Sequence, residues 1–357
     1  MKIAVILPRG MQFSPQGATS IDIVARDLIL KSRFRDATYV IGAATPEPFE
    51  DVDFRPVHAT NQVSLIREFL KKLRADLPDV VVVHQHPETA ARISKALPGT
   101  PVLLHRHGLL KESRSVISKW KKRRQFSRLA GIVFVSGFIR DRFLAQFPSF
   151  EDRETVVFNG VDTSVWAPAQ AKRQEIVYVG RARQDKGLLP LIGAYRSLSA
   201  NDWSLKLILG VQTEAETSFA KQIDVSCADL ANVAIFQNAP SAAVQRHLSE
   251  AAIAALPSIV REGFPRAVVE AMASGCAVIA TNQGGTPEAA GDAALLLDEP
   301  DTEDFETRLT NSLAELINDG QRRNQLATAG RQRVVGALGL EAVANRYDNL
   351  LEKLAEA

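Results

Sequence analysis

The chain has 357 residues, 46% of them hydrophobic and 24% charged, with a formal net charge of +2. At about 150 residues per domain, this length favours two domains. The balanced charge disfavours a disordered chain and a general nucleic-acid binder. Cys227 and Cys276 are the only cysteines and fit neither a disulfide framework nor a metal site, so we expect a reducing cytosol. We expect no signal peptide, because the N-terminal apolar run is short and meets Pro8 at once, and no membrane span, because no segment approaches about 18 uninterrupted apolar residues.

Short β-rich runs alternate with longer helical patterns along almost the whole chain. This alternation is typical of βαβ units and of parallel sheets covered on both faces. In the first half the expected strands are 2–8, 37–44, 79–85, 101–107, 131–136 and 155–160. In the second half they are 175–180, 205–211, 232–237, 252–258, 276–281 and 293–298. The fold class is therefore α/β.

A polar, proline-containing stretch at 159–174 lacks periodicity and indicates a linker. We expect two facing Rossmann-like domains, 1–165 and 166–335, with the ligand in a central cleft, because open α/β sheets bind ligands beyond the carboxyl ends of their strands. Residues 336–357 have a helical pattern and should dock back on the N-terminal domain. The apolar face of that helix consists of Val343, Tyr347, Leu350, Leu351 and Leu354.

A single carboxylate, Glu270, stands in the apolar helical run "PRAVVEAMA". An unpaired buried carboxylate costs several kcal/mol, so we expect a partner that this stretch does not itself supply. Pro265 suits the first helical position and Gly275 the residue past the end, which leaves the first N–H groups open as an anion site. Glu262 and the flexible Gly263 precede that site.

A nucleotide diphosphate bonded to a sugar would use all these groups, with Glu270 accepting hydrogen bonds from ribose hydroxyls. The alternative is that Glu270 pairs with an Arg or Lys of the core. The expected donor-binding residues of this segment are Gly263, Phe264, Arg266, Ala267, Val268 and Glu270.

The strand at 175–180 leads into the loop "GRARQDKG". We expect Gly180 to end the strand and to take part in donor binding. Arg181 and Lys186 should lie where this strand passes into the loop. Two cations there suit a departing diphosphate, whose charge grows as its bond to the sugar breaks. The loop is not a Walker loop, because Asp185 stands where a glycine should precede the lysine. The alternative is that both cations are only solvated.

Together these motifs resemble those of retaining GT-B glycosyltransferases of family four. The shared pieces, in family order, are "FNGVDTSVWAP", "GRARQDKG", the E-x₇-E segment "EGFPRAVVE" with "AMASGCAVIAT" after it, and "GGTPE". The first of these is the domain junction, and the resemblance covers essentially the full chain. It implies that Glu262 contacts the donor sugar, Glu270 the ribose, and Arg181 with Lys186 the diphosphate.

The resemblance also assigns residues of the N-terminal half. A glycine-rich turn near the donor phosphate corresponds to "SPQGATS" with Gly17, where Ala18 replaces the usual second glycine. His105 ends a strand where the family commonly has a histidine near the transferred sugar, and the alternative is a hydrogen-bonded structural histidine. The remaining strand-end histidines are His84 and His86, which could line the acceptor side, and His107. No GxGxxG motif supports an NAD site.

Five basic residues surround a tryptophan in "SKWKKRRQFSRL". Basic side chains near an anionic leaflet contribute about 1 kcal/mol each, and an aromatic ring suits the interface, so we expect contact with a membrane surface. The alternatives are a solvated helix face and a nucleic-acid site, which the near-neutral total charge disfavours. The segment comprises Lys119, Trp120, Lys121, Lys122, Arg123 and Arg124.

The sequence therefore predicts a cytoplasmic, peripherally membrane-associated glycosyltransferase that uses a nucleotide diphosphate sugar. The acceptor would be a glycan or lipid-linked hydroxyl of a bacterial envelope polysaccharide or lipopolysaccharide. The resemblance implies retention, with the leaving phosphate accepting the acceptor's proton. We expect no obligatory metal or other cofactor, and no nucleic-acid partner. The alternatives are a sugar-nucleotide epimerase or hydrolase of the same architecture and a non-catalytic nucleotide-sugar-binding protein.

Overall fold

The computed structural model describes residues 1–8, 10–112, 115–198, 202–298, 300 and 302–356. The chain forms two compact units. Unit 1 consists of Met1–Gly160 and Leu340–Ala357, and unit 2 consists of Val161–Gly339. The division falls at 160–161, whereas the sequence places it at 165–166, and the C-terminal helix belongs to unit 1. Each unit holds one parallel sheet with helices, as the predicted α/β class requires.

Unit 1 has a seven-stranded sheet in the order β3-β2-β1-β4-β5-β6-β7, and every pair in it is parallel. Its strands are β1 (Ile3–Ile6), β2 (Thr38–Ala43), β3 (Asp53–Val57), β4 (Val80–His84), β5 (Val102–Arg106), β6 (Gly131–Phe134) and β7 (Glu154–Val156). Its helices are α1 (Ser20–Lys31), α2 (Gln62–Ala75), α3 (Pro87–Ala96), α4 (Val116–Phe126), α5 (Gly137–Leu144) and α13 (Leu340–Glu356).

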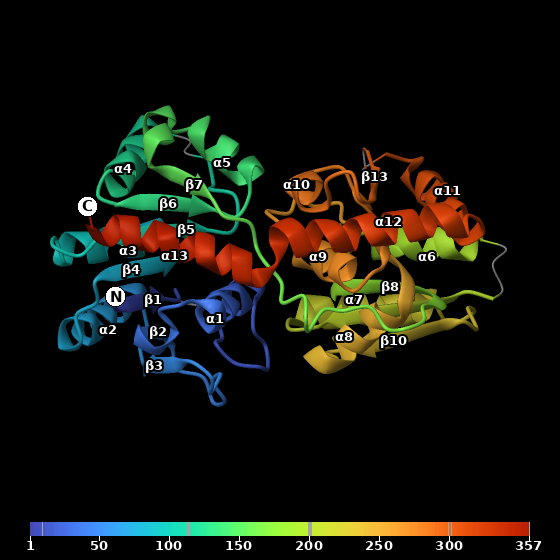
Figure 1. The fold of residues 1–357 in the computed structure, drawn as a ribbon, viewed down its shortest axis with the longest axis horizontal. Coiled ribbons are helices and arrows are strands. Elements are labelled where there is room, and N and C mark those ends of the chain that lie inside the picture. The colour runs from blue at the N-terminus through green and yellow to red at the C-terminus, as the bar shows by residue number, and fades with distance from the viewer. Residues whose placement is uncertain (9, 113–114, 199–201, 299, 301, 357) are drawn as a thin grey trace. The chain divides into compact units, whose positions relative to one another are not determined.

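The core of unit 1 forms around the central strands β1, β4 and β5, whose residues are all buried. Helix α13 packs against α1 and β4 (Figure 1), and its buried Val343, Tyr347 and Leu351 join the same hydrophobic cluster. The buried carboxylate of Asp348 accepts hydrogen bonds from Ser32 Oγ at 2.7 Å and from the backbone N–H of Arg33 at 2.9 Å. These bonds fix α13 to the end of α1.

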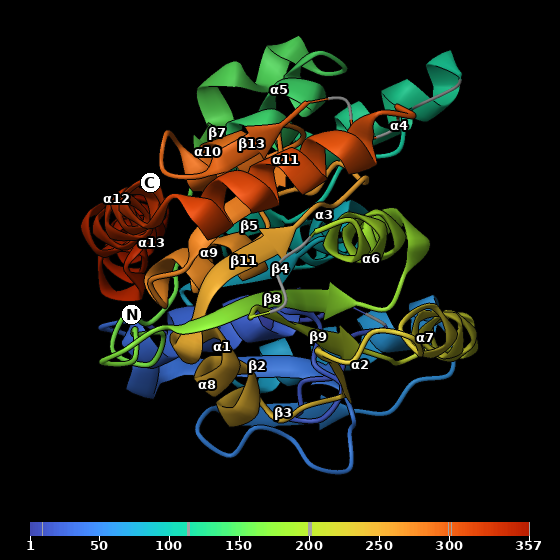
Figure 2. The ribbon, with the colours of Figure 1, turned by 90° about the vertical axis from the view of Figure 1, so that its right-hand side faces the viewer.

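Unit 2 has a six-stranded sheet in the order β10-β9-β8-β11-β12-β13, and Figure 2 shows β8 and β11 side by side within it. Its strands are β8 (Arg173–Arg181), β9 (Ser204–Gly210), β10 (Val233–Gln237), β11 (Ala251–Leu256), β12 (Ala277–Thr281) and β13 (Leu295–Leu297). Its helices are α6 (Leu188–Arg196), α7 (Glu214–Ser226), α8 (Ser241–Glu250), α9 (Arg266–Ala273), α10 (Thr286–Ala290), α11 (Phe305–Asn318) and α12 (Gly320–Arg333).

Every strand expected from the sequence is present, but β3 was not expected. Its sequence, DFRPV, contains two charged residues and Pro56, a composition typical of a loop. β3 lies at the edge of its sheet, where a proline is tolerated because one side of the strand needs no ladder hydrogen bonds.

Both sheets reverse their strand order once, between β1 and β4 in unit 1 and between β8 and β11 in unit 2. Such switch points open a crevice at the carboxyl ends of the strands, where α/β sheets bind ligands. Among the described residues, no helix is both long and apolar enough to span a bilayer. Cys227 and Cys276 are buried free thiols.

Candidate functional site

The switch point of unit 2 brings together the loops that follow β8 and β11. The expected end of β8 at Gly180 is wrong, because Gly180 pairs with Leu209 and the strand continues through Arg181, which pairs with Gly210. A glycine offers no barrier to strand pairing when its dihedral angles stay extended. The strand thus carries Arg181 to the edge of the crevice on a rigid element.

Backbone contacts tie the two loops to one another. The carbonyl oxygen of Asp185 accepts hydrogen bonds from the N–H groups of Ile259 at 2.9 Å and Val260 at 3.0 Å. Gly187 has φ +72°, and a Cβ built there would lie 1.9 Å from the carbonyl oxygen of Pro257. Only glycine fits this close approach of two backbones. The loop that carries Lys186 is therefore held against the loop that carries Glu262.

Lys186 and Glu262 form an ion pair across this contact, with Lys186 Nζ 2.9 Å from Glu262 Oε1. The "GGTPE" segment supports Glu262 from the other side, because Gly285 donates its N–H to the Glu262 carbonyl oxygen at 2.8 Å. Gly284 has φ +63°, and a Cβ there would lie 2.4 Å from the same oxygen. Three of the sequence motifs thus meet at Glu262.

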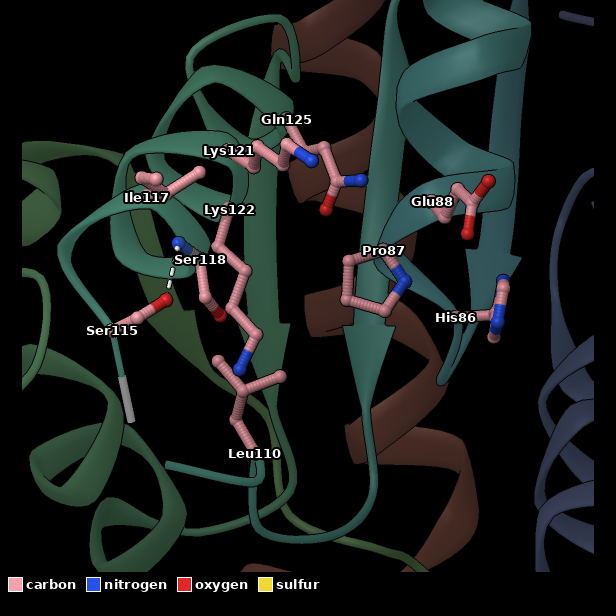
Figure 3. A pocket seen from close by; sticks show the side chains of 10 residues that line it. All are labelled: His86, Pro87, Glu88, Leu110, Ser115, Ile117, Ser118, Lys121, Lys122 and Gln125. Carbon is pink, nitrogen blue, oxygen red and sulfur yellow. Dashed lines mark hydrogen bonds between the residues drawn. The ribbon is translucent and has the colours of Figure 1, made fainter. Parts of the chain in front are cut away.

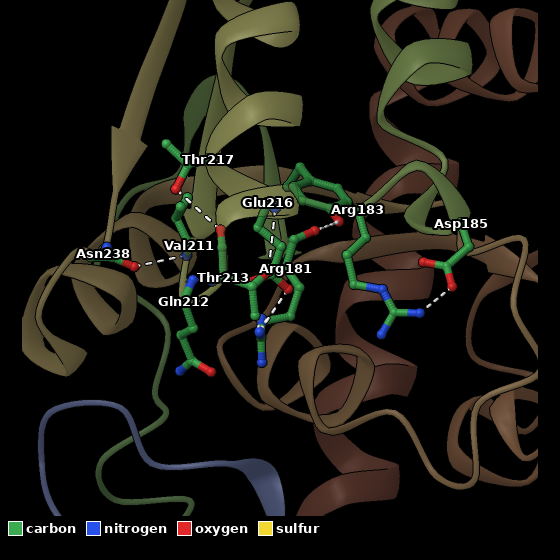
Figure 4. Close-up of polar contacts among 10 residues, drawn as sticks. Arg181, Arg183, Asp185, Val211, Gln212, Thr213, Glu216, Thr217 and Asn238 are labelled. Carbon is green, nitrogen blue, oxygen red and sulfur yellow. Dashed lines mark hydrogen bonds and ion pairs between the residues drawn. The ribbon is translucent and has the colours of Figure 1, made fainter.

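Arg181 also forms an ion pair with a carboxylate. Its Nη2 lies 2.6 Å from Glu216 Oε1 (Figure 4). Glu216 belongs to the capping box of α7, whose N-cap is Thr213, and it accepts the N–H of Gln212 at 2.9 Å. Burial would raise the pKa of Glu216, but the hydrogen bonds from Arg181 and Gln212 lower it overall. Sequence reasoning missed Glu216, although the T-x-x-E spacing of 213–216 was a signal for the start of α7.

Helix α9 begins beside Glu262, and among the described residues no side chain caps its N-terminus. Pro265 is the N-cap residue, so the helix starts one residue later than expected, at Arg266. The N–H groups of its first turn therefore have an open end, as an anion site requires. Gly275 follows the helix with φ +73°, as predicted, and Cys276 donates its N–H to the Ala271 carbonyl oxygen at 3.0 Å.

The partner of Glu270 lies in its own helix, which corrects the expectation that this stretch supplies none. Arg266 Nη2 lies 3.1 Å from Glu270 Oε1, and Arg266 Nε donates to the same oxygen at 3.2 Å. Both side chains are almost buried, at 10% and 13% exposure. An i,i+4 spacing places the two side chains on one face of a helix. The pair neutralises Glu270. Of the other donor-segment residues, Phe264 and Val268 are buried.

In unit 1 the loop after β1 contains Gly17 with φ +83°, where a Cβ would lie 2.4 Å from Gln12 Oε1. The following helix is closed by its own capping box, in which Asp22 Oδ2 accepts the N–H of Thr19 at 2.8 Å. Asp22 is fully buried, and burial raises its pKa. At the start of α1 the Asp22 carboxylate thus already accepts the N–H of Thr19, a group that an approaching phosphate would otherwise meet.

The strand-end histidines separate into two groups. His84, His105 and His107 form a stacked cluster at the carboxyl ends of β4 and β5, with each ring centroid within 5.0 Å of the other two. His86 instead caps α3, where its Nδ1 accepts the N–H of Thr89 at 3.3 Å. Sequence reasoning named these histidines singly and did not foresee the cluster, because His84 and His105 meet only once β4 pairs with β5.

A cavity of about 440 Å³ lies in unit 1 between the start of α3 and the helix α4 (Figure 3). Figure 3 shows Lys121, Lys122 and Gln125 of α4 on one side, and Pro87 and Glu88 of α3 on the other. The basic run is thus helical, and among its residues within α4 only Phe126 is buried. Large apolar side chains are exposed beside it: Leu109, Val116, Ile117 and Trp120.

Two family models match the chain. Glycosyl transferases group 1 matches residues 166–333, and Glycosyltransferase Family 4 matches residues 32–165. The chain belongs to glycosyltransferase family 4. The predicted E-x₇-E segment, the Arg181–Lys186 loop and "GGTPE" all lie within the group 1 match, and the histidine cluster and the basic helix lie within the family 4 match.

The chain is also similar in sequence to characterised enzymes over most of their length. The chain is 27% identical to alpha-maltose-1-phosphate synthase of Mycolicibacterium smegmatis, over 80% of this chain and 84% of that protein. It is 24% identical to lipopolysaccharide 1,2-N-acetylglucosaminetransferase of Salmonella typhimurium, over 83% of this chain and 78% of that protein. These similarities identify the chain as a glycosyltransferase.

Solved glycosyltransferases confirm the GT-B fold. A glycosyltransferase from Rickettsia africae superposes with a TM-score of 0.81 at 16% identity, covering 99% of this chain and 98% of that one. The Anabaena protein HepE, solved in complex with UDP and glucose, superposes with a TM-score of 0.79 at 16% identity and covers 99% of each chain.

Proposed function

We propose that the chain transfers a sugar, with retention of anomeric configuration, from a nucleoside diphosphate donor to a hydroxyl of a glycan or glycolipid. The observation that carries this proposal is the Lys186–Glu262 pair at the switch point of unit 2, beside the open N-terminus of α9. A cation, a carboxylate and a helix N-terminus that no described side chain caps together match a diphosphate bonded to a polyhydroxyl sugar. UDP bound to HepE supports a nucleotide donor for this fold.

In this mechanism the donor diphosphate replaces Glu262 as the partner of Lys186. Arg181, already oriented by Glu216, adds a second cation as negative charge grows on the leaving diphosphate. Glu262 is then available to accept hydrogen bonds from sugar hydroxyls. The bond between the anomeric carbon and the phosphate oxygen breaks, the acceptor oxygen bonds to that carbon on the same face, and the acceptor's proton passes to the leaving phosphate. These residues position the reactants and stabilise charge.

We place the acceptor in unit 1, near the cavity between α3 and α4. Lys121 and Lys122 line this cavity together with Ser115, Ser118 and Gln125, a set that suits a polar and partly anionic glycan. The exposed Val116, Ile117 and Trp120 and the cations of α4 support contact with an anionic membrane surface. The name of the Salmonella relative supports a role in envelope glycan synthesis. The free buried thiols favour a cytoplasmic enzyme.

The experiment that tests the proposal is a thermal-shift screen of UDP-, GDP- and ADP-sugars, followed by turnover assays with glycan acceptors. A donor at a hundredfold its dissociation constant adds about 2.7 kcal/mol to the free energy of unfolding. NMR of the product gives the anomeric configuration. Stabilisation by a donor with no transfer to any acceptor would favour a binding protein, and an epimer or rapid sugar release without acceptor would favour an epimerase or hydrolase.

A further inference from the structure

The histidine cluster of unit 1 consists of three side chains that offer metal-ligating atoms to one another. One ring nitrogen from each of His84, His105 and His107 lies within 4.8 Å of the other two. His84 Nδ1 and His107 Nε2 are 2.9 Å apart. Three nitrogens bound to a tetrahedral zinc ion at 2.0–2.1 Å would lie about 3.4 Å apart. Small side-chain rotations therefore bring all three nitrogens to ligand distance.

The sheet holds the three histidines close to one another. His84 and His105 are direct partners in the β4–β5 ladder, so their Cα positions are fixed by the sheet. His107 follows β5 by one residue, and its ring stacks on His105 with centroids 4.3 Å apart. Two rigid strands thus present the three rings from one edge of the sheet, as a preorganised site requires.

His105 carries an unsatisfied nitrogen. Its Nε2 is buried and, within the described part of the chain, has no hydrogen-bond partner. Its other nitrogen, Nδ1, lies 3.3 Å from the hydroxyl of Tyr347 on α13. A buried polar atom without a partner costs free energy, and a histidine ligand characteristically has its second nitrogen held by an outer partner. Tyr347 supplies such a partner.

The surroundings of the three rings favour the neutral form of imidazole. Burial lowers the pKa of His84 to about 3, and burial with the neighbouring histidines lowers the pKa values of His105 and His107 well below 6.5. Neutral imidazole is the form that ligates a metal ion. Arg106, whose positive charge also lowers the pKa of His107, directs its guanidinium to the carbonyl oxygens of Gln85 and Gly108, to which it donates hydrogen bonds.

We propose that His84, His105 and His107 form a binding site for one divalent transition-metal ion, with zinc as the preferred ion and solvent as the fourth ligand. Imidazole ligands suit zinc, and a set of three protein ligands leaves one position open. His107 is only half-buried, which gives the ion a route from solvent. Bound metal would join the carboxyl ends of β4 and β5 and stabilise unit 1.

The test uses the full chain, free of any affinity tag and stripped of metal by a chelator. Cobalt(II) serves as the probe, because its visible absorption reports coordination by nitrogen ligands, and zinc is then added to displace it. We expect one equivalent of cobalt to bind, its absorption to vanish as zinc displaces it, and zinc to raise the melting temperature. His107→Gln should weaken cobalt affinity by about 100-fold or more, beyond what loss of an outer partner costs, and Tyr347→Phe by about 10-fold.

His86→Gln is the matched control, because His86 stands in the same strand-end motif but caps α3 and does not belong to the cluster. His58→Gln controls for an exposed histidine. Both variants should keep the cobalt absorption, and circular dichroism checks that every variant is folded. Absence of cobalt absorption in the wild type, or equal affinity in His107→Gln, would overturn the proposal and leave a neutral hydrogen-bonded stack. No sugar nucleotide enters this assay, so its failure leaves the proposed glycosyl transfer intact.

Discussion

Lys186 and Glu262 form an ion pair across the switch point of unit 2, with 2.9 Å between Nζ and Oε1. The resemblance to family members assigns these two side chains to different parts of a donor, the diphosphate and the sugar. They neutralise each other, and both stay partly exposed, at 16% and 28%. We infer that donor binding exchanges one ionic partner of Lys186 for another.

The first prediction concerns this exchange. Lys186→Ala should lower kcat by roughly 10²-fold or more, because a preorganised cation at the leaving group is worth about 2.7–4 kcal/mol. The fold should persist, since Glu262 remains accessible to water. Arg183→Ala is the matched control, because Arg183 lies in the same loop but pairs with Asp185. Steady-state kinetics with circular dichroism checks both variants, and wild-type turnover in folded Lys186→Ala would remove Lys186 from the leaving-group site.

The second prediction concerns Glu270. Because Arg266 pairs with Glu270, Glu270→Gln should leave a nearly buried guanidinium without its carboxylate and lower the stability of the apo protein by about 1–3 kcal/mol. This direction is opposite to the one expected for a carboxylate whose only partner is ribose. If Glu270 also binds ribose, affinity for the nucleoside diphosphate should fall by about 1.5–3 kcal/mol.

Thermal melts and calorimetric titration measure these two effects separately. Arg266→Met combined with Glu270→Gln completes a double-mutant cycle for the pair. Unchanged nucleotide affinity in Glu270→Gln would exclude the ribose contact, and unchanged apo stability would show that the ion pair contributes nothing.

Much of this architecture could be predicted because parallel strands buried on both faces read as apolar runs, as in β4 and β12. β3 could not be predicted in this way, since an edge strand with Pro56 lacks that signal. The site motifs were also readable, because glycines such as Gly187 and Gly284 are required where backbones touch.

The pairings within the site were harder to predict. Lys186 meets Glu262 only because β8 and β11 are neighbours in the sheet. Neither loop sequence indicates that strand order. The histidine cluster likewise depends on β4 pairing with β5. The Arg266–Glu270 pair is different, because both residues lie in the segment PRAVVEAMA and their i,i+4 spacing alone indicates the contact.

The third prediction concerns the basic helix α4. Replacing Lys121, Lys122, Arg123 and Arg124 by Gln should strongly reduce sedimentation with anionic liposomes, because each cation contributes about 1 kcal/mol near such a surface. Affinity for the donor should not change, since the Lys186–Glu262 pair lies in unit 2 and the unit 1 residues assigned to the donor, Gly17 and His105, lie outside α4. Lys71→Gln with Arg74→Gln, on α2 of the same unit, is the control. Equal sedimentation of the quadruple variant and the parent would identify α4 as a solvated helix.

The fourth prediction concerns acid stability. Arg181 and Gln212 hold the pKa of Glu216 below its ordinary value of 4.5 against the effect of burial, so in that range the folded state binds fewer protons than the unfolded state. The resulting stabilisation is present above pH 4.5 and is lost as pH falls through the folded pKa. Glu216→Gln should be less stable at pH 7 and should show a shallower loss of melting temperature below about pH 5.

Melting curves at a series of pH values measure this slope. Glu214→Gln, at an exposed position in the same helical turn, should keep the wild-type slope. An unchanged slope in Glu216→Gln would mean that the Arg181–Glu216 contact does not persist in solution.

The last prediction concerns the contact that brings the two site loops together. Gly187→Ala should be destabilising by at least about 1–3 kcal/mol, the usual cost of a non-glycine residue in a sparsely populated backbone region. The true cost should be larger, because the added Cβ meets the carbonyl oxygen of Pro257 at 1.9 Å and backbone atoms on both sides must move. That movement separates Lys186 from Glu262, so donor affinity should fall together with stability.

Gly336→Ala is the control in the same unit, since a Cβ there meets nothing within 4 Å and its φ is not positive. Denaturant unfolding and nucleotide titration of both variants check the prediction, and a Gly187→Ala protein as stable as Gly336→Ala would show that the two loops do not approach as closely as described.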